Sequence, residues 1–218
     1  MNDRDIHSAI RILRREVPKW HTPIVTLMAE TYQSPFRVLI SCILSLRTQD
    51  ATTARASHRL FAVADSAETM AKLTAKKIEK LIYPVGFYKT KAKNILEICQ
   101  TIIDRYNGEV PDEIDELLKF KGVGRKTANL VVTLGYQKPG ICVDTHVHRI
   151  SNRWGYVKTK TPEKTEFALR AKLPKQYWIE YNDLLVSFGQ HLCRPISPLC
   201  SQCPVKKYCK QIDVGVRR

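Results

Sequence analysis

Apolar residues recur at intervals of three and four along most of the chain, the spacing that places side chains on one face of an α-helix. No stretch shows the strict alternation of a β-strand, and we find no internal repeat or low-complexity linker. The spacing predicts helices over residues 5–17, 35–46, 50–60, 89–106, 113–120, 125–134, 145–154, 162–173 and 177–192, with shorter ones after Ser66 and Thr74. The expected fold class is therefore all-α.

Residues at the ends of these segments support the prediction. Ser34 is a good N-cap for the helix that begins at Pro35, because proline is favoured in the first turn. Asn107 and Gly108 favour the left-handed backbone that ends a helix, so the long helix over 89–106 should stop there.

A glycine-rich turn joins two of the predicted helices, in the sequence Lys121-Gly-Val-Gly-Arg-Lys-Thr-Ala-Asn129. Gly122 and Gly124 supply positive φ angles and bare amides, so a phosphate can approach the start of the second helix. A P-loop would need a glycine where Arg125 stands, directly before Lys126 and Thr127, and a dinucleotide fingerprint would need a preceding strand. The pattern indicates a helix-hairpin-helix anion site.

Lys126 stands in the first turn of that second helix, where the helix dipole makes a positive charge unfavourable by roughly 0.3–1 kcal/mol. The same field favours the neutral, nucleophilic form of an amine. Asp144 follows eighteen residues later, and the extended segment over 137–143 can return the chain by about the 15 Å that the helix gains. We therefore expect the two side chains to meet.

Simpler interpretations of the same residues stay open. Lys126 could bind a phosphate as a plain cation, and Asp144 suits the N-cap of the helix that begins at Thr145. A metal triad of Asp144, His146 and His148 would need a strand in place of that helix.

The net charge of the chain limits the kinds of molecule that it is expected to bind. The 218 residues hold 36 Lys and Arg against 21 Asp and Glu, a formal net charge of +15, which favours nucleic acid or another polyanion. The first residues lack the apolar region of a signal peptide, and the longest apolar stretch, Val38 to Leu46, is far short of a bilayer span. We expect an intracellular protein of the cytoplasm or nucleoid that does not associate with membranes.

Seven cysteines in a reducing compartment indicate metal binding or buried thiols rather than disulfides. Four have the spacing C-x6-C-x2-C-x5-C, at Cys193, Cys200, Cys203 and Cys209. Four thiols so close in sequence point to a metal centre, either zinc or iron–sulfur, and the single C-x2-C pair tilts the choice towards a cubane cluster. Cys42, Cys99 and Cys142 are expected to be core residues.

The hairpin sequence together with Val143-Asp-Thr-His146 closely resembles the endonuclease III family of DNA glycosylases, from Pro35 to Cys209. The resemblance implies that Lys126 is the Schiff-base nucleophile and Asp144 its electrostatic and base partner. It identifies the four-cysteine loop as a ligand set for a [4Fe–4S] cluster. It also implies two domains, a helical barrel over residues 28–138 and a discontinuous cluster domain over 1–27 and 139–218.

The resemblance further implies a set of DNA-contact residues. They are Arg47, Phe87, Lys121, Gly122, Val123, Gly124, Arg125, Thr127 and His146. Phe87 stands where the family wedges an apolar residue between base pairs, although it could instead be a buried aromatic. Arg47 departs from the family's glutamine, which fills the gap left by the extruded base, and it could also be a plain surface residue. Phe120-Lys-Gly122 replaces the usual Leu-Pro-Gly, which adds charge and removes rigidity.

The function implied by the resemblance is that of a bifunctional glycosylase and abasic-site lyase. It would remove oxidised or ring-saturated pyrimidines from duplex DNA and cut the strand by β-elimination, acting as a monomer. Two alternatives stay open at the level of sequence. One is a mismatch glycosylase for adenine, thymine or uracil without lyase activity, and the other is a non-catalytic module that binds damaged DNA.

Overall fold

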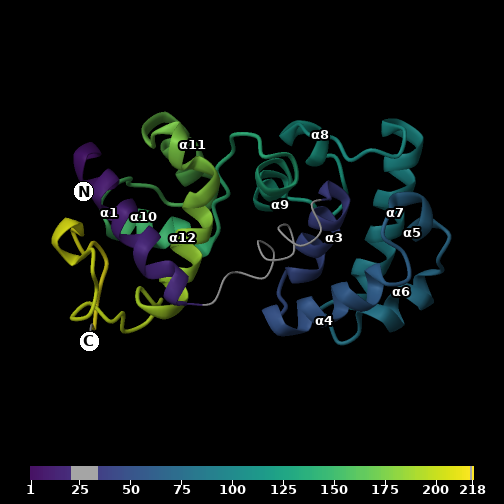
Figure 1. The fold of residues 1–218 in the computed structure, drawn as a ribbon, viewed down its shortest axis with the longest axis horizontal. Coiled ribbons are helices and arrows are strands. Elements are labelled where there is room, and N and C mark those ends of the chain that lie inside the picture. The colour runs from purple at the N-terminus through teal and green to yellow at the C-terminus, as the bar shows by residue number, and fades with distance from the viewer. Residues whose placement is uncertain (21–33, 217) are drawn as a thin grey trace. The chain divides into compact units, whose positions relative to one another are not determined.

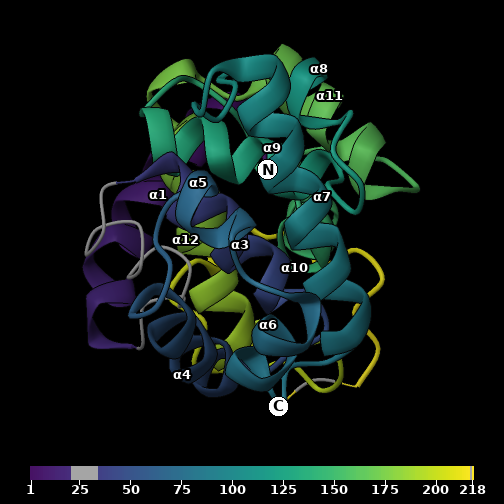
Figure 2. The same ribbon diagram turned by 90° about the vertical axis from the view of Figure 1, so that its right-hand side faces the viewer.

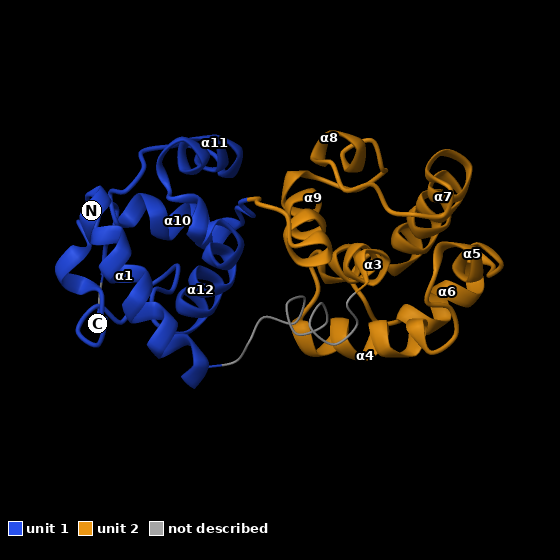
Figure 3. Ribbon diagram, turned by 45° about the horizontal axis from the view of Figure 1, so that its top comes forward, with its two compact units in different colours: residues 1–23, 141–218 blue, residues 24–140 orange. Residues whose placement is uncertain are grey.

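The computed structural model describes residues 1–20, 34–216 and 218 (Figure 1). Within these residues every regular element is a helix, which confirms the all-α prediction. None of the described helices is long and apolar enough to cross a membrane. The chain divides into two compact units, which are coloured separately in Figure 3.

Unit 1 combines the start and the end of the chain, residues 1–23 and 141–218, and unit 2 comprises residues 24–140. The first predicted domain boundary, at residue 28, lies outside the described residues. The second was expected after residue 138, and the units divide after Gly140. The assignment of one unit as a barrel and the other as a cluster domain stays a prediction.

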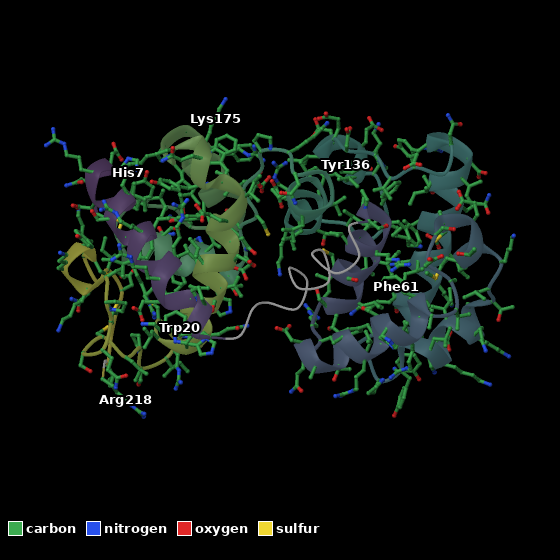
Figure 4. The ribbon with its side chains drawn as sticks, in the orientation of Figure 1. His7, Trp20, Phe61, Tyr136, Lys175 and Arg218 are labelled. Atoms are coloured by element: carbon green, nitrogen blue, oxygen red, sulfur yellow. The ribbon has the colours of Figure 1, made fainter. Side chains whose placement is uncertain are left out.

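Unit 1 is built on a buried face of its first helix. Its elements are α1 (Asp3–Glu16), η1 (Val17–Lys19), α10 (Thr145–Arg153), α11 (Pro162–Lys172), η3 (Lys175–Tyr177), α12 (Trp178–His191) and η4 (Lys206–Tyr208). Helix α1 buries Ile6, Ile10 and Leu13 as its spacing predicted, and it packs against α12. Trp20, labelled in Figure 4, stacks on Phe188 and His191 and closes one end of this core.

Unit 2 is arranged around α3 (Pro35–Ser45), whose side chains from Val38 to Leu44 are all buried. The other elements are α4 (Asp50–Phe61), α5 (Ala67–Ala71), α6 (Ala75–Ile82), α7 (Tyr88–Tyr106), α8 (Ile114–Leu117), α9 (Arg125–Leu130) and η2 (Val131–Gly135). Helix α3 contacts α4, α7, α9 and η2, and Figure 2 shows α7 beside α5 and α6. Cys42 and Cys99 are buried here, as expected of core residues.

The predicted caps of unit 2 are present. The hydroxyl of Ser34 accepts a bond from the Arg37 amide, and Pro35 occupies the first turn of α3. Asn107 takes the left-handed conformation with a φ of 52°, and α7 ends there. These ends follow from local sequence alone, which explains why they could be placed before the structure was known.

Two elements differ from their predicted form. The helix expected over 113–120 is only one turn, α8, and tighter i→i−3 bonds carry the chain on to Phe120 before it reverses. The helix expected over 125–134 changes into a π-helix at Val131, where the Thr133 hydroxyl bonds the carbonyl of Asn129. The π-helix packs against α3, and α8 contacts α9.

Candidate active site

The glycine turn uses its two glycines differently. Gly122 has a φ of 82°, a left-handed angle that glycine adopts without strain, and the expectation for it is met. Gly124 has an ordinary φ of −103°, so the predicted positive angle is wrong there. It is the N-cap of α9, and a Cβ at this position would meet nothing within 4 Å. Gly124 therefore leaves open space over the first amides of α9.

The basic residues of the turn differ in their surroundings. Lys126 is exposed in the first turn of α9, as expected. Lys121 pairs with Glu97 at 3.0 Å and Lys119 pairs with Glu116 at 2.6 Å, so carboxylates offset part of the positive charge of the turn. Exposed ion pairs of this kind contribute little stability, and an incoming phosphate could replace them.

Two other predicted DNA contacts are buried. The side chain of Thr127 is 2% exposed, and that of Val123 is buried among apolar neighbours. The amide of Val123 already donates to the carbonyl of Phe120 at 3.0 Å, so a phosphate contact would come from the backbone of Thr127. Arg125 is partly exposed.

Asp144 caps α10 in unit 1, as the simpler interpretation expected. Its Oδ1 accepts bonds from the amides of His146, at 2.8 Å, and Val147, at 2.9 Å. Because both bonds end on one oxygen, Oδ2 stays outside the cap. The capping role fixes the carboxylate at the helix start without using all of its acceptor capacity.

The metal triad of Asp144, His146 and His148 does not form. The two imidazoles have other partners: Arg149 donates to Nδ1 of His146 at 3.1 Å, and Nδ1 of His148 lies 2.6 Å from the Thr165 hydroxyl. Burial lowers the pKa of His148, which favours its neutral form. Both residues lie on a helix, where the triad was expected to fail.

Lys126 belongs to unit 2 and Asp144 to unit 1. Each unit presents its own side chain at the start of a helix, Lys126 in the first turn of α9 and Asp144 at the N-cap of α10. That the two meet stays a prediction.

Arg47 and Phe87 lie on two loops of unit 2 and contact each other. Both are non-glycine residues with left-handed backbone, at φ 52° and 57°. Phe87 is 62% exposed, which excludes the buried aromatic. The guanidinium carbon of Arg47 lies 5.6 Å from the centre of the Phe87 ring, a cation–π contact. The structure thus brings together two residues separated by forty positions in the sequence.

The four cysteines of the C-terminal loop line a common hollow. They do not converge on one point, since no group of three His, Cys, Asp or Glu within the described ranges could hold a metal ion. A single zinc would need sulfurs about 2.3 Å from its centre. Four thiols that line one hollow are a donor set that either zinc or an iron–sulfur cluster uses.

Polar groups surround these sulfurs in a way that suits thiolates. The amide of Gln211 donates to Sγ of Cys209 at 3.3 Å, and Arg153 donates to Sγ of Cys193 at 3.6 Å. Burial raises the pKa of Cys203 to about 12, while a bond from the Val205 amide acts in the opposite direction. Such N–H donors are typical of the surroundings of cluster ligands, so the loop fits the expected group.

Two arginines that the sequence analysis did not single out hold the cysteine loop. Arg153 is buried and donates to the carbonyls of Arg194 and Pro195, each at 2.7 Å. Arg149 donates to the carbonyl of Cys193 at 2.8 Å. Arg153 lies three residues after buried Ile150, so a charge at an apolar position of the helical pattern was the signal for it.

A lysine of unit 2 was missed in the same way. Lys91 precedes the inward-facing Ile95 by one helical turn, and it is buried at the base of the loops that carry Arg47 and Phe87.

A family model and the relatives found by sequence comparison agree with one another. A family model of HhH-GPD superfamily base excision DNA repair proteins matches residues 40–175. The chain is 49% identical over 176 residues to endonuclease III of Thermotoga maritima, which covers 81% of this chain and 83% of the relative. It is 37% identical over 181 residues to endonuclease III of Bacillus subtilis, which covers 83% of each.

Solved structures show the same similarity over nearly the whole chain. A trapped covalent intermediate of endonuclease III with DNA superposes with a TM-score of 0.85 at 33% identity, covering 97% of each chain. A thermostable thymine-DNA glycosylase superposes with a TM-score of 0.74 at 23% identity, covering 92% of this chain and 96% of that one. The second likeness concerns the fold alone.

Proposed function

Because the chain belongs to the HhH-GPD superfamily of base excision DNA repair proteins, and within it to the endonuclease III family, we propose that it is a DNA glycosylase with abasic-site lyase activity. The observation that carries the proposal is the exposed lysine at the start of α9, directly after the glycine turn, in a chain 49% identical to an endonuclease III. The trapped covalent complex of a similar enzyme with DNA supports a covalent route.

In the proposed reaction the amine of Lys126 attacks C1′ of the damaged nucleotide, and the base departs as a Schiff base forms. Asp144 supports this step with Oδ2, the carboxylate oxygen outside the cap, by stabilising the positive charge that develops on the sugar. Loss of a proton from C2′ then breaks the C3′–O bond and cuts the strand. Both residues begin helices, which orients them before the substrate arrives.

Binding of the duplex uses groups with different roles. The amides around Gly122 and Gly124 hold a phosphate, assisted by Lys121 and Arg125, and they position the strand without reading its sequence. Thr127 contributes its backbone only, because its side chain is buried, and Val123 supports the turn through its bond to the Phe120 carbonyl. On the other unit, His146 follows Asp144 by two residues in the first turn of α10 and is proposed to contact the DNA as well.

Arg47 and Phe87 act on the base stack in this proposal. The exposed ring of Phe87 wedges between base pairs, and Arg47 fills the gap left by the extruded nucleotide. An arginine offers only donors to the orphaned base, whereas glutamine offers a donor and an acceptor. The preference for the opposite base should therefore differ from that of family members with glutamine.

The cysteine loop is the proposed site of a [4Fe–4S] cluster. Its ligands would be Cys193, Cys200, Cys203 and Cys209, which surround one hollow. When bound, the cluster would supply a structural crosslink rather than reaction chemistry. Nearby Arg194, Lys206 and Lys207 are exposed and suit contact with the DNA backbone.

The proposed substrates are oxidised or ring-saturated pyrimidines in duplex DNA, which the protein would meet as a monomer in the cytoplasm or nucleoid. The test is a cleavage assay on four duplexes that carry thymine glycol, an abasic site, a T·G mismatch or an A·G mismatch. Base removal with strand cleavage on the first two supports the proposal.

The other outcomes identify the alternatives. Removal of a mismatched base that leaves the strand uncut would indicate a glycosylase without lyase activity. Tight binding of the abasic duplex with no cleavage of any substrate would indicate a non-catalytic module for damaged DNA.

A further inference from the structure

Lys91 is a buried lysine to which the proposed chemistry gives no role. It lies in the first turns of α7 with 6% of its surface exposed. Its Nζ donates three hydrogen bonds: to the carbonyl of Leu44 at 2.9 Å, to the carbonyl of Leu46 at 2.6 Å, and to the Thr48 hydroxyl at 3.3 Å. An ammonium group has three donors, so all of them are used.

Two of these acceptors belong to the end of α3. The last carbonyls of a helix have no partner within the helix, and the negative end of its dipole attracts a cation. Lys91 supplies both the donors and the charge, although it comes from a different helix. It therefore fixes the end of α3 against the start of α7.

The third acceptor, Thr48, extends this tie to the neighbouring loop. Its hydroxyl donates to the carbonyl of Leu46 at 3.2 Å and accepts from the amide of Gly86 at 3.1 Å as well as from Lys91. One hydroxyl hydrogen and two lone pairs are thus all engaged. The loop that contains Arg47 and the loop that leads to Phe87 are joined through this one side chain.

The two loops also touch directly. A Cβ at Gly86 would lie 2.6 Å from the carbonyl oxygen of Arg47, closer than any side chain can approach. Residues Arg47 and Phe87 each hold a left-handed backbone, which is strained for a residue other than glycine. Such strain persists only where the surrounding contacts over-determine the conformation.

Lys91 provides those contacts at a cost. Burial lowers its pKa to about 8, because the ammonium is removed from water. A neutral residue could fill the same space without that cost. Its position beneath both strained residues gives a reason for the charge.

We propose that Lys91 is a positioning residue that holds Arg47 and Phe87 side by side, ready to enter the duplex together where the damaged nucleotide leaves it. The inference rests on the proposed function, because it assumes that these two residues act on the base stack. Lys91 itself touches neither the DNA nor the reacting atoms.

The test compares Lys91→Met with Lys93→Met on abasic DNA in duplex and single-stranded form. Lys93 is an exposed lysine of the same helix, so the control removes the same charge. A single strand has no partner base to displace and no stack to open. Lys91→Met should slow cleavage of the duplex by on the order of 10–100-fold, as expected for misplaced positioning groups, and leave the single-strand rate unchanged. Equal loss on both substrates, or no loss on either, would overturn the proposal.

A second pair of variants guards against a folding defect. Thr48→Val keeps the lysine and removes the shared hydroxyl, and it should reduce duplex cleavage in the same selective way by a smaller factor. In an Arg47→Ala, Phe87→Ala background, Lys91→Met should cause no further loss of duplex cleavage. A further loss there would show that Lys91 acts by another route and contradict the inference.

The same measurements distinguish a failure of this inference from a failure of the proposed function. A wild-type protein that cleaves neither substrate refutes the lyase itself. In that case the affinity for a duplex with a tetrahydrofuran abasic analogue, relative to the undamaged duplex, takes the place of cleavage. Lys91→Met should lower that ratio while Lys93→Met does not, and equal ratios would refute the positioning role.

Discussion

The turn that carries Lys126 and the loops that carry Arg47 and Phe87 obtain unusual backbone in different ways. At the turn, the left-handed position is Gly122, which adopts a φ of 82° without strain. At the loops the left-handed positions are an arginine and a phenylalanine, and contacts from Lys91 and Thr48 brace the chain around them. The turn is specified locally, whereas the loops depend on residues more than thirty positions away.

This difference predicts two kinds of loss of activity in variants of the protein. A substitution in the turn or in the residues next to it should slow cleavage of every substrate. A change in the loops or their supports should matter only where a duplex must be opened.

The largest expected effect is that of Asp144→Asn on cleavage. Asparagine still accepts the two amide bonds, so the cap and the stability of unit 1 should be kept. The loss of negative charge should slow cleavage by roughly 10²–10⁴-fold on duplex and single-stranded abasic DNA alike. Single-turnover rates on both substrates, with thermal unfolding as the control, measure it. A loss of cleavage confined to the duplex would contradict the distinction between catalytic residues and the residues of the loops.

A smaller effect separates the two glycines of the turn. Gly122→Ala should destabilise the protein by about 1–2 kcal/mol, because alanine must hold a left-handed angle and its Cβ would lie 3.0 Å from the amide nitrogen of the Asn94 side chain. Gly124→Ala should leave stability nearly unchanged, since its backbone is ordinary and the space beside it is open. Urea unfolding of the two variants gives the comparison, and equal destabilisation would show that the turn does not rely on Gly122.

Strain at the loops predicts a difference between two variants of one residue. Phe87→Gly and Phe87→Ala both remove the ring, so both should reduce cleavage of duplex substrates. The glycine variant should be the more stable of the two by about 1 kcal/mol, because only alanine keeps the left-handed penalty at φ 57°. Equal unfolding free energies would mean that the angle is not strained.

The smallest expected effect is a change in stability between pH 7 and 8. Burial lowers the pKa of Lys91 to about 8 from an ordinary value of 10.5, so above pH 8 the folded protein releases a proton that the unfolded chain retains. Stability from this group should therefore rise with pH, by about 0.3 kcal/mol between pH 7 and 8 and further up to about 10.5. Lys91→Met should lack this rise, and unfolding curves of both proteins across that range provide the measurement. Parallel stability curves would contradict the burial cost.

The sequence predicted those features whose cause is local. Ser34, Asn107 and Gly122 each determine the backbone next to them, and the ends of their elements were placed correctly. Capping by Asp144 was also foreseen from its position before a helix. The angle at Gly124 was wrong because a glycine permits a left-handed backbone without requiring it.

Features that depend on distant contacts were missed or left undecided. The exposure of Phe87 follows from the packing of α7, and its contact with Arg47 joins loops forty residues apart. Lys91 and Arg153 interrupt apolar helical patterns, a signal that marks a buried charge without naming its partner. The π-helix after α9 packs against α3, where a Cβ at Gly135 would lie 3.0 Å from the Cα of Pro35.

The central claim is that Lys126 attacks the sugar and forms a Schiff base. Borohydride reduction during reaction with an abasic duplex and a thymine glycol duplex, followed by digestion and mass spectrometry, tests it most directly. We predict a covalent adduct on both duplexes, located on the peptide that contains Lys126 and absent from Lys126→Gln. An adduct on another lysine, or none on either duplex, would contradict this account.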